Sequence, residues 1–287
     1  MALALVFLML AGAPAALAEK RIALVIGNGA YVKVPKLPNP TNDSAAMAGL
    51  LRKAGFDVVE EKADLRADAM RRALRDFSEH VHDADVAVVF YAGHGMEMNG
   101  VNYLIPVDAT LARDVDVEDE AVSLDRVIRT IEPVRRLQLV ILDACRDNPF
   151  LRSMRRTVVS RSARSGHADI DEKTLPPNTL IAFAQKAGAT ADDGTGGNSP
   201  YTTALLKHLP TPGLDVELAL RRVRDEVLRA TRNRQEPYKY GSLGGAELPL
   251  VPAVASPLAP TEPVSTAERE WQQYGTAASG TTNKRRR

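Results

Sequence analysis

The chain has 287 residues, of which 45% are hydrophobic and 25% are charged, so it can bury one large core or two small ones. Its 37 Lys and Arg against 36 Asp and Glu leave a formal net charge of +1, which gives no whole-chain reason to expect nucleic acid as a partner. There is one cysteine, Cys145, so an intramolecular disulfide is excluded and the lone thiol needs a chemical explanation.

Residues 1–18 form an apolar run that ends in small residues just before the charged Glu19 and Lys20. The run is too short to cross a bilayer, and Ala16 and Ala18 have the spacing of a cleavage site. The pattern predicts a secretory signal peptide and an exported protein, periplasmic or secreted, without a membrane-spanning segment in the mature chain. No Lys or Arg precedes the run, and a buried first helix is the alternative.

Short apolar runs alternate with helical patterns from Arg21 to about residue 250. This alternation predicts an α/β fold, in which helices cover both faces of a parallel sheet. The runs are nearly continuous in apolar character, as expected of strands covered on both sides. The candidate strands are residues 22–26, 58–60, 86–91, 137–143 and 179–184.

Four helical patterns lie between and after these strands. The first starts at Asn42 and stops at Gly55, and the second covers residues 67–81. The third is capped by Asn198 or Ser199, with Pro200 at the first helical position, where its missing N–H costs nothing. The fourth is an amphipathic helix over residues 214–231.

Two stretches depart from the alternation. Residues 148–178 are polar and predict an exposed linker loop, and residues 251–287 are rich in Pro, Ser, Thr and Ala and predict a disordered tail with a basic end. We therefore expect one domain over residues 19–250. The arginines of the linker loop are Arg152, Arg155, Arg156, Arg161 and Arg164.

Two chemically reactive residues lie at the carboxyl ends of predicted strands. His94 comes after the strand at 86–91, and Cys145 comes after the strand at 137–143. Because the carboxyl ends of parallel strands share one edge of a sheet, we expect the two side chains to meet there. A thiol is mostly protonated at neutral pH, and a neighbouring imidazole can activate it. The backbone amides of Gly95 and Cys145 are candidates for an oxyanion hole.

Each residue alone also has a structural interpretation, because most buried cysteines are inert and most histidines at strand ends are simply hydrogen-bonded. Three segments favour the catalytic interpretation. They are Tyr-Ala-Gly-His-Gly at 91–95, Leu-Asp-Ala-Cys-Arg at 142–146, and Ala-Leu-Val-Ile-Gly-Asn at 23–28 followed by Tyr31. Together they resemble the caspase-like cysteine peptidases, and bacterial metacaspases and paracaspases more than animal caspases. The resemblance covers roughly residues 21–240, and the family places its histidine about 50 residues before its cysteine.

The resemblance implies a caspase-like three-layer αβα sandwich with a mostly parallel sheet of about six strands. It also implies a cysteine endopeptidase that cuts polypeptides through a dyad of His94 and Cys145 and an acyl-enzyme intermediate. Metacaspases and paracaspases hold Arg or Lys with acidic residues, and the matching acids are Asp43, Asp143 and, in a loop that aligns poorly, Asp192. Paired carboxylates suit a guanidinium. The alternative for Asp43 is an acid placed in the first turn by the helix dipole.

Three further expectations follow from the same resemblance. The loop at 148–178 joins the large and small catalytic segments, so it is either a self-cleavage linker or a solvated basic loop. Many metacaspases bind calcium, but the acidic run at 114–120 lacks the spacing of an EF-hand, so we expect a solvated acidic loop there, no metal site and no required cofactor. Activation by calcium stays open. The oligomeric state stays open. A catalytically silent binding or scaffold module with the same fold is the alternative function.

Overall fold

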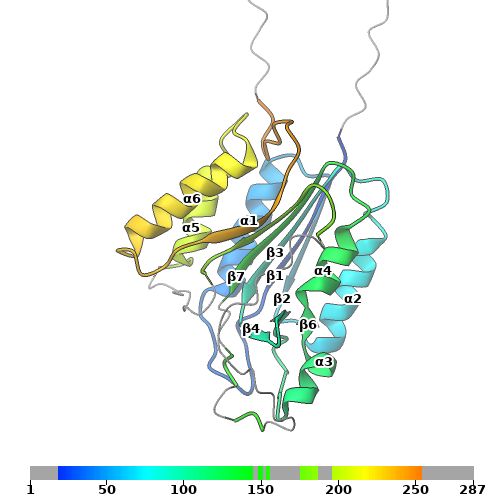
Figure 1. The fold of residues 1–287 in the computed structure, drawn as a ribbon, viewed down its shortest axis with the longest axis vertical. Coiled ribbons are helices and arrows are strands. Elements are labelled where there is room, and N and C mark those ends of the chain that lie inside the picture. The colour runs from blue at the N-terminus through cyan, green and yellow to red at the C-terminus, as the bar shows by residue number, and fades with distance from the viewer. Residues whose placement is uncertain (1–18, 145–147, 151–152, 156–174, 187–195, 254–287) are drawn as a thin grey trace, which may run out of the picture. The chain divides into compact units, whose positions relative to one another are not determined.

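The computed structural model describes residues 19–144, 148–150, 153–155, 175–186 and 196–253. Its main sheet has six strands in the order β2-β1-β3-β7-β8-β9 (Figure 1). All neighbouring pairs run parallel except β8 and β9, which are antiparallel. The mostly parallel six-stranded sheet confirms the predicted α/β fold. The strands are β1 (Arg21–Gly27), β2 (Val58–Ala63), β3 (Val86–Gly93), β7 (Leu137–Ala144), β8 (Thr179–Phe183) and β9 (Tyr238–Ser242).

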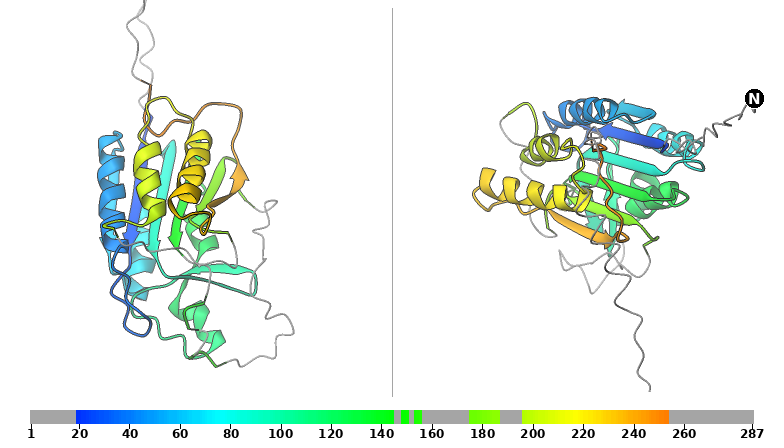
Figure 2. Two further views of the ribbon diagram at one scale, coloured as in Figure 1. Left: turned by 90° about the vertical axis from the view of Figure 1, so that its left-hand side faces the viewer. Right: turned by 90° about the horizontal axis from the view of Figure 1, so that it is seen from above.

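Helices cover both faces of the main sheet (Figures 1 and 2). On one face lie α1 (Pro40–Lys53), α5 (Pro200–His208) and α6 (Val216–Ala230), and on the other lie α2 (Ala67–Ser78) and α4 (Leu124–Ile131). Alternate residues of a strand point to opposite faces. In β1, Ala23 and Val25 accordingly join the core under the first group of helices, and Ile22, Leu24 and Ile26 join the core under the second.

The start of α1 differs from the prediction. We expected Asn42 at its beginning, whereas the helix begins at Pro40 with Asn39 as its N-cap. Proline fits the first helical position, because the N–H that it lacks would have no partner there. By contrast, of the two caps that we considered for α5, the structure has Ser199, since its side chain accepts a hydrogen bond from the Thr202 N–H, and Pro200 is the first helical residue as predicted.

A small second sheet was not predicted. It consists of β4 (Gly95–Met98), β5 (Val101–Leu104) and β6 (Val122–Ser123), and two short helices, η1 (Asp114–Asp116) and α3 (Val117–Glu120), precede β6. Segments of two to four residues are too short for a periodic signal. A turn signal was nevertheless present, because Asn99 and Gly100 both have positive φ between β4 and β5, as a type I′ hairpin turn requires.

The buried Arg21 connects the two ends of the described domain. Its guanidinium donates hydrogen bonds to the carbonyl oxygens of Ala54 and Leu250 and lies 4.4 Å from the centre of the Phe56 ring. The residues just after β9 are thereby tied to the first strand. Within the described ranges, none of the helices is long and apolar enough to cross a bilayer.

Candidate active site

The ends of β3 and β7 lie side by side. In their parallel register, Ala92 is opposite Asp143 and Gly93 is opposite Ala144. His94 follows Gly93 directly, and Cys145 follows Ala144 directly. Cys145 itself lies outside the described residues, as does Asp192. The register therefore brings together the two strand ends from which the predicted dyad extends.

The backbone of His94 is held by two buried tyrosines. The His94 N–H donates to the Tyr31 hydroxyl at 2.7 Å, and the Tyr91 hydroxyl donates to the His94 carbonyl at 2.7 Å. The two hydroxyl oxygens lie 3.2 Å apart. Burial raises the pKa of both tyrosines well above the usual value, so both stay protonated and can donate. His94 is thus fixed through its main chain on both sides.

Gly93 makes this arrangement possible. Its φ is +152°, and a Cβ at this position would lie 2.6 Å from the Tyr31 hydroxyl oxygen and 2.7 Å from that of Tyr91. Atoms at that separation overlap, so a side chain would displace the hydroxyls that hold His94. The glycine before the histidine is therefore required by the close approach of the two tyrosines.

The imidazole of His94 has a defined orientation. Its Nε2 atom lies 2.9 Å from the carbonyl oxygen of Pro35, and its ring centre lies 4.5 Å from that of Tyr31. A carbonyl oxygen only accepts hydrogen bonds, so Nε2 carries the proton and the neutral ring has its lone pair on Nδ1. Burial lowers the pKa of His94, although the Pro35 carbonyl opposes this effect. A neutral imidazole of this kind can accept a proton at Nδ1.

The two predicted pocket acids lie close together in the structure, because both contact Ser199. Asp43 accepts hydrogen bonds at Oδ1 from the Ser199 N–H at 3.0 Å and from the Asn198 side chain at 2.9 Å. Asp143 accepts at Oδ2 from the hydroxyls of Ser199 at 2.5 Å and Thr202 at 2.7 Å. Asp43 is 1% exposed and Asp143 is 8% exposed. The first turn of α1 and the end of β7 thus place two carboxylates at the start of α5.

These contacts bear on the alternative for Asp43. It does lie in the first turn of α1, where the helix dipole favours an acid. Its carboxylate nevertheless accepts hydrogen bonds from Asn198 and Ser199, which precede a different helix. Near Asp143, burial raises the pKa of Tyr201, and the negative charge of Asp143 adds to this rise. Asp43 therefore both lies where it stabilises α1 and forms part of a buried acidic site.

Gly95, the candidate for the oxyanion hole, is the first residue of β4 and pairs with Leu104. Gly95, Leu142 and Ala144 line one small cavity of about 10 Å³. The residue with the candidate amide therefore lies near the end of β7, from which Cys145 follows.

The acidic run at 114–120 takes part in local contacts. Asp116 accepts from the Arg113 side chain at 2.6 Å, and Glu120 accepts from the N–H groups of Thr110 and Leu111. Among the residues whose structure is described, no group of three or more His, Cys, Asp and Glu side chains is placed to hold a metal ion. The run therefore stabilises the loop before β6.

Sequence reasoning missed the supports of this site. Tyr31 and Tyr91 had been noted only as parts of motifs, and Pro35 contributes through its carbonyl, which has no sequence signature. Ser199 had been predicted only as a helix cap, and its additional bonds to the two acids come from tertiary packing. The spacing of Tyr91 and His94 within one motif was the available signal.

Comparison with known proteins identifies the family. The model of the caspase domain matches residues 20–245. The chain is 32% identical over 131 residues to the human mucosa-associated lymphoid tissue lymphoma translocation protein 1, and 31% identical over 131 residues to its mouse homolog. In both cases the alignment covers 45% of this chain and 15% of the relative, so the chain matches a small part of these longer proteins. Since the match to the caspase domain extends over most of the chain, including both strand ends of the candidate site, this protein belongs to the caspase family of cysteine peptidases.

Proposed function

We propose that this protein is a cysteine endopeptidase that cleaves polypeptides after Arg or Lys, with His94 and Cys145 as its catalytic dyad. One observation carries the proposal. The end of β7 contributes Asp143, which shares Ser199 with Asp43, and two residues later the same segment contributes Cys145. The nucleophile and an acidic pocket for the preceding residue of the substrate are thus adjacent in the chain.

In the proposed reaction, Nδ1 of His94 takes the proton of the Cys145 thiol, and the sulfur attacks the carbonyl carbon of the scissile bond. The C–S bond forms while the carbonyl electrons move to oxygen, where the amides of Gly95 and Cys145 stabilise the negative charge. When this tetrahedral intermediate collapses, the C–N bond breaks and the imidazolium of His94 gives its proton to the leaving amine. Water then attacks the acyl carbon while His94 takes one of its protons. The C–S bond breaks to release the carboxylic acid, and the imidazolium returns the proton to the sulfur, which restores the thiol.

The choice of Arg or Lys follows from charge and geometry. Two buried carboxylates side by side favour a cationic side chain, and a guanidinium can make forked hydrogen bonds to them. The pKa of His94 is lowered by burial, so a neutral imidazole is available at neutral pH to act on the thiol. We include Asp192 in the proposed pocket from the resemblance alone, because it lies outside the described residues.

The experiment is hydrolysis of fluorogenic peptides that end in Arg, Lys, Asp or Leu, with calcium or with a chelator. We expect cleavage after Arg and Lys that does not require calcium, disappears in Cys145→Ala and His94→Ala, and falls at least tenfold in Asp143→Asn. Asp225→Asn, which changes an acid that is 67% exposed, is the matched control and should leave the rate unchanged. Cleavage after Asp or Leu at equal rates would refute the specificity. Absence of any cleavage would favour a caspase-shaped binding module.

We further propose that the linker loop at 148–178 is cut by the enzyme itself, because it contains five arginines. Purified wild type should separate into two fragments on a denaturing gel, whereas Cys145→Ala should remain whole. Cleavage in both proteins would point to a contaminating peptidase. We also propose export through residues 1–18, for which the amino-terminal residue of the mature protein, expected to be Glu19, is the test.

A further inference from the structure

A cavity of about 410 Å³ lies between α5, α6 and the strands β8 and β9. None of its lining residues belongs to the dyad, the pair Asp43 and Asp143, or the residues that hold them. Its inner wall includes Ala182, Tyr201 and Leu220, which are buried and belong to the core under α5 and α6. The cavity is large enough for an apolar side chain together with its neighbours, since ligand pockets range from roughly 300 to 1,000 Å³.

The rim of this cavity is cationic. Lys186, Arg221, Arg224 and Lys239 line it, with Glu236 as the acidic residue among the lining side chains. The carboxylate of Glu236 forms ion pairs with both Lys186, at 2.7 Å, and Arg224, at 2.5 Å. Lys239 pairs with Glu217 at 2.5 Å. The positive charge of the lining therefore exceeds its negative charge.

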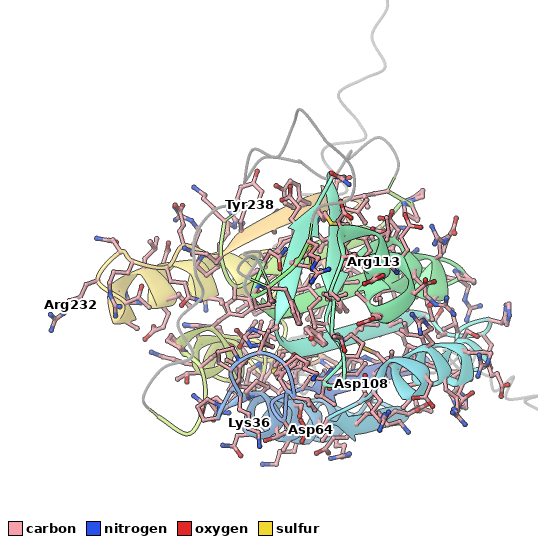
Figure 3. All side chains as sticks on the ribbon, turned by 90° about the horizontal axis from the view of Figure 1, so that it is seen from below. Lys36, Asp64, Asp108, Arg113, Arg232 and Tyr238 are labelled. Carbon is pink, nitrogen blue, oxygen red and sulfur yellow. The ribbon has the colours of Figure 1, made fainter. Side chains whose placement is uncertain are left out.

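Arg221 is the cation best placed to meet a ligand. It is exposed on α6, and within the described part of the chain it makes no hydrogen bond or ion pair. Tyr238, labelled in Figure 3, lies on the edge strand β9 and is 42% exposed, which is high for so large a side chain. Lys186 lies 5.9 Å from the centre of its ring. A free guanidinium and an accessible aromatic ring that line the same cavity suit a ligand that has both an anionic group and an apolar group.

We propose that this cavity binds an acidic segment of a polypeptide. An apolar side chain enters beside Tyr201 and Leu220, and a neighbouring Asp or Glu pairs with Arg221. A flat anionic surface fits less well, because the positive charge lines a hollow and is partly balanced by Glu236 and Glu217. Charge complementarity of this kind gives selectivity and faster association more than affinity alone.

The position of the cavity suggests the source of the segment. Tyr201 lines the cavity and lies between Ser199 and Thr202, whose hydroxyls both donate to Asp143. The cavity and the pocket proposed for Arg or Lys therefore both use residues from the first turn of α5. We infer that the acidic segment belongs to the substrate, a step that rests on the proposed function, whereas the binding itself does not.

The binding test uses the full chain with Cys145→Ala and a dye-labelled peptide, Asp-Glu-Phe-Asp-Glu, followed by fluorescence anisotropy. Arg221→Glu should weaken binding about tenfold, which corresponds to about 1.4 kcal/mol. Arg222→Glu is the matched control, because it makes the same charge change at the next position of α6, is also exposed, and does not line the cavity. It should change the dissociation constant less than twofold.

Several results would overturn the proposal. If Arg221→Glu and Arg222→Glu weakened peptide binding equally, the peptide would be attracted by net charge alone. If the Cys145→Ala chain without either substitution did not bind the peptide, the proposed site would be refuted. Binding to anionic phospholipid vesicles that Arg221→Glu abolishes, without peptide binding, would identify a membrane site in its place.

The cleavage test distinguishes this inference from the proposed function. The active enzyme is compared on a short Arg peptide with and without an acidic extension. We expect the extension to lower KM in wild type and Arg222→Glu, and to have no effect in Arg221→Glu. Loss of cleavage of the short peptide would count against the proposed function, whereas equal KM values for both peptides in wild type would count against the cavity as a substrate site.

Discussion

Ser199 donates its hydroxyl to Asp143 at 2.5 Å while its own backbone N–H donates to Asp43 at 3.0 Å. One residue therefore joins two acids that lie a hundred positions apart in sequence, and its hydroxyl also caps α5. We expect Ser199→Ala to raise KM for an Arg peptide three- to tenfold with a smaller change in kcat, and to lower the free energy of unfolding by about 1 kcal/mol through loss of the cap.

Thr202→Val separates these two effects. It removes the second hydroxyl that donates to Asp143 at 2.7 Å and leaves the cap intact. Like Ser199→Ala, it should raise KM for the Arg peptide, but it should lower the free energy of unfolding less, because the cap remains. A fall in kcat at constant KM in both variants would contradict a role of these hydroxyls in substrate binding. Steady-state kinetics and urea unfolding measure the two quantities.

Tyr31→Phe removes the hydroxyl that accepts the His94 N–H at 2.7 Å. A buried donor left without a partner costs about 1–3 kcal/mol, so His94 should lose its fixed position. We expect kcat to fall by about tenfold or more with little change in KM, because Tyr31 acts through His94. Tyr103→Phe is the control, since Tyr103 is also buried but makes no hydrogen bond or ring contact with His94 among the described residues. Equal effects of both substitutions would indicate general destabilisation.

Burial lowers the pKa of His94, and this sets the sign of two pH effects. A base that must be neutral works only above its pKa, so the acid limb of kcat/KM should lie below the ordinary histidine value of about 6.5. The unfolded chain binds this proton more readily than the folded chain, so the contribution of His94 to stability is lost as pH falls below about 6.5. An acid limb above pH 7 in wild type would contradict this assignment.

His94→Gln tests the stability effect separately. It removes the titrating group, so the free energy of unfolding of this variant should depend less on pH between about 6.5 and 5 than that of the wild type. Urea unfolding at a series of pH values measures the difference. Parallel curves for the two proteins would show that other groups dominate the acid sensitivity.

Gly93→Ala should destabilise the protein by about 1–3 kcal/mol and reduce kcat, because its Cβ would overlap the hydroxyls of Tyr31 and Tyr91. Gly49→Ala is a matched glycine substitution. Gly49 lies inside α1, and apart from its chain neighbours and the backbone of the helix itself, no described heavy atom lies within 4 Å of the position that its Cβ would take. It should therefore stabilise the helix by roughly 0.5–1 kcal/mol. Thermal unfolding of the two variants should shift in opposite directions, and shifts of the same sign would refute the steric account.

The sequence could predict those residues of the site that lie at the ends of strands. Apolar runs before His94 and Asp143 indicated two parallel strands, and parallel strands end at one edge, so their juxtaposition followed. The supports could not be predicted in the same way. The bond from His94 to Pro35 joins residues far apart in sequence and uses a backbone carbonyl that every residue has.

The same distinction holds for the fold. The five predicted apolar runs all lie in strands, but β2 is an edge strand with no buried residue and so is not covered on both sides as we expected. The strand β9 was not predicted, because Tyr238–Ser242 is short, partly exposed and contains a glycine. Gly241 has positive φ and lies so near the Thr179 carbonyl that a Cβ there would overlap it. This strand forms because it pairs with β8. Such a pairing between distant segments cannot be predicted from the local sequence.

The connection between β1 and α1 contains Tyr31 and Pro35, which hold His94, and it leads directly into the turn that contains Asp43. In the function that we propose, reactivity and selectivity therefore depend on the same segment. An insertion or deletion there that changes which residue is accepted also moves the imidazole. Altered preference without loss of turnover should instead arise by substitution near Asn198 and Thr202, which contact the acids and not the histidine.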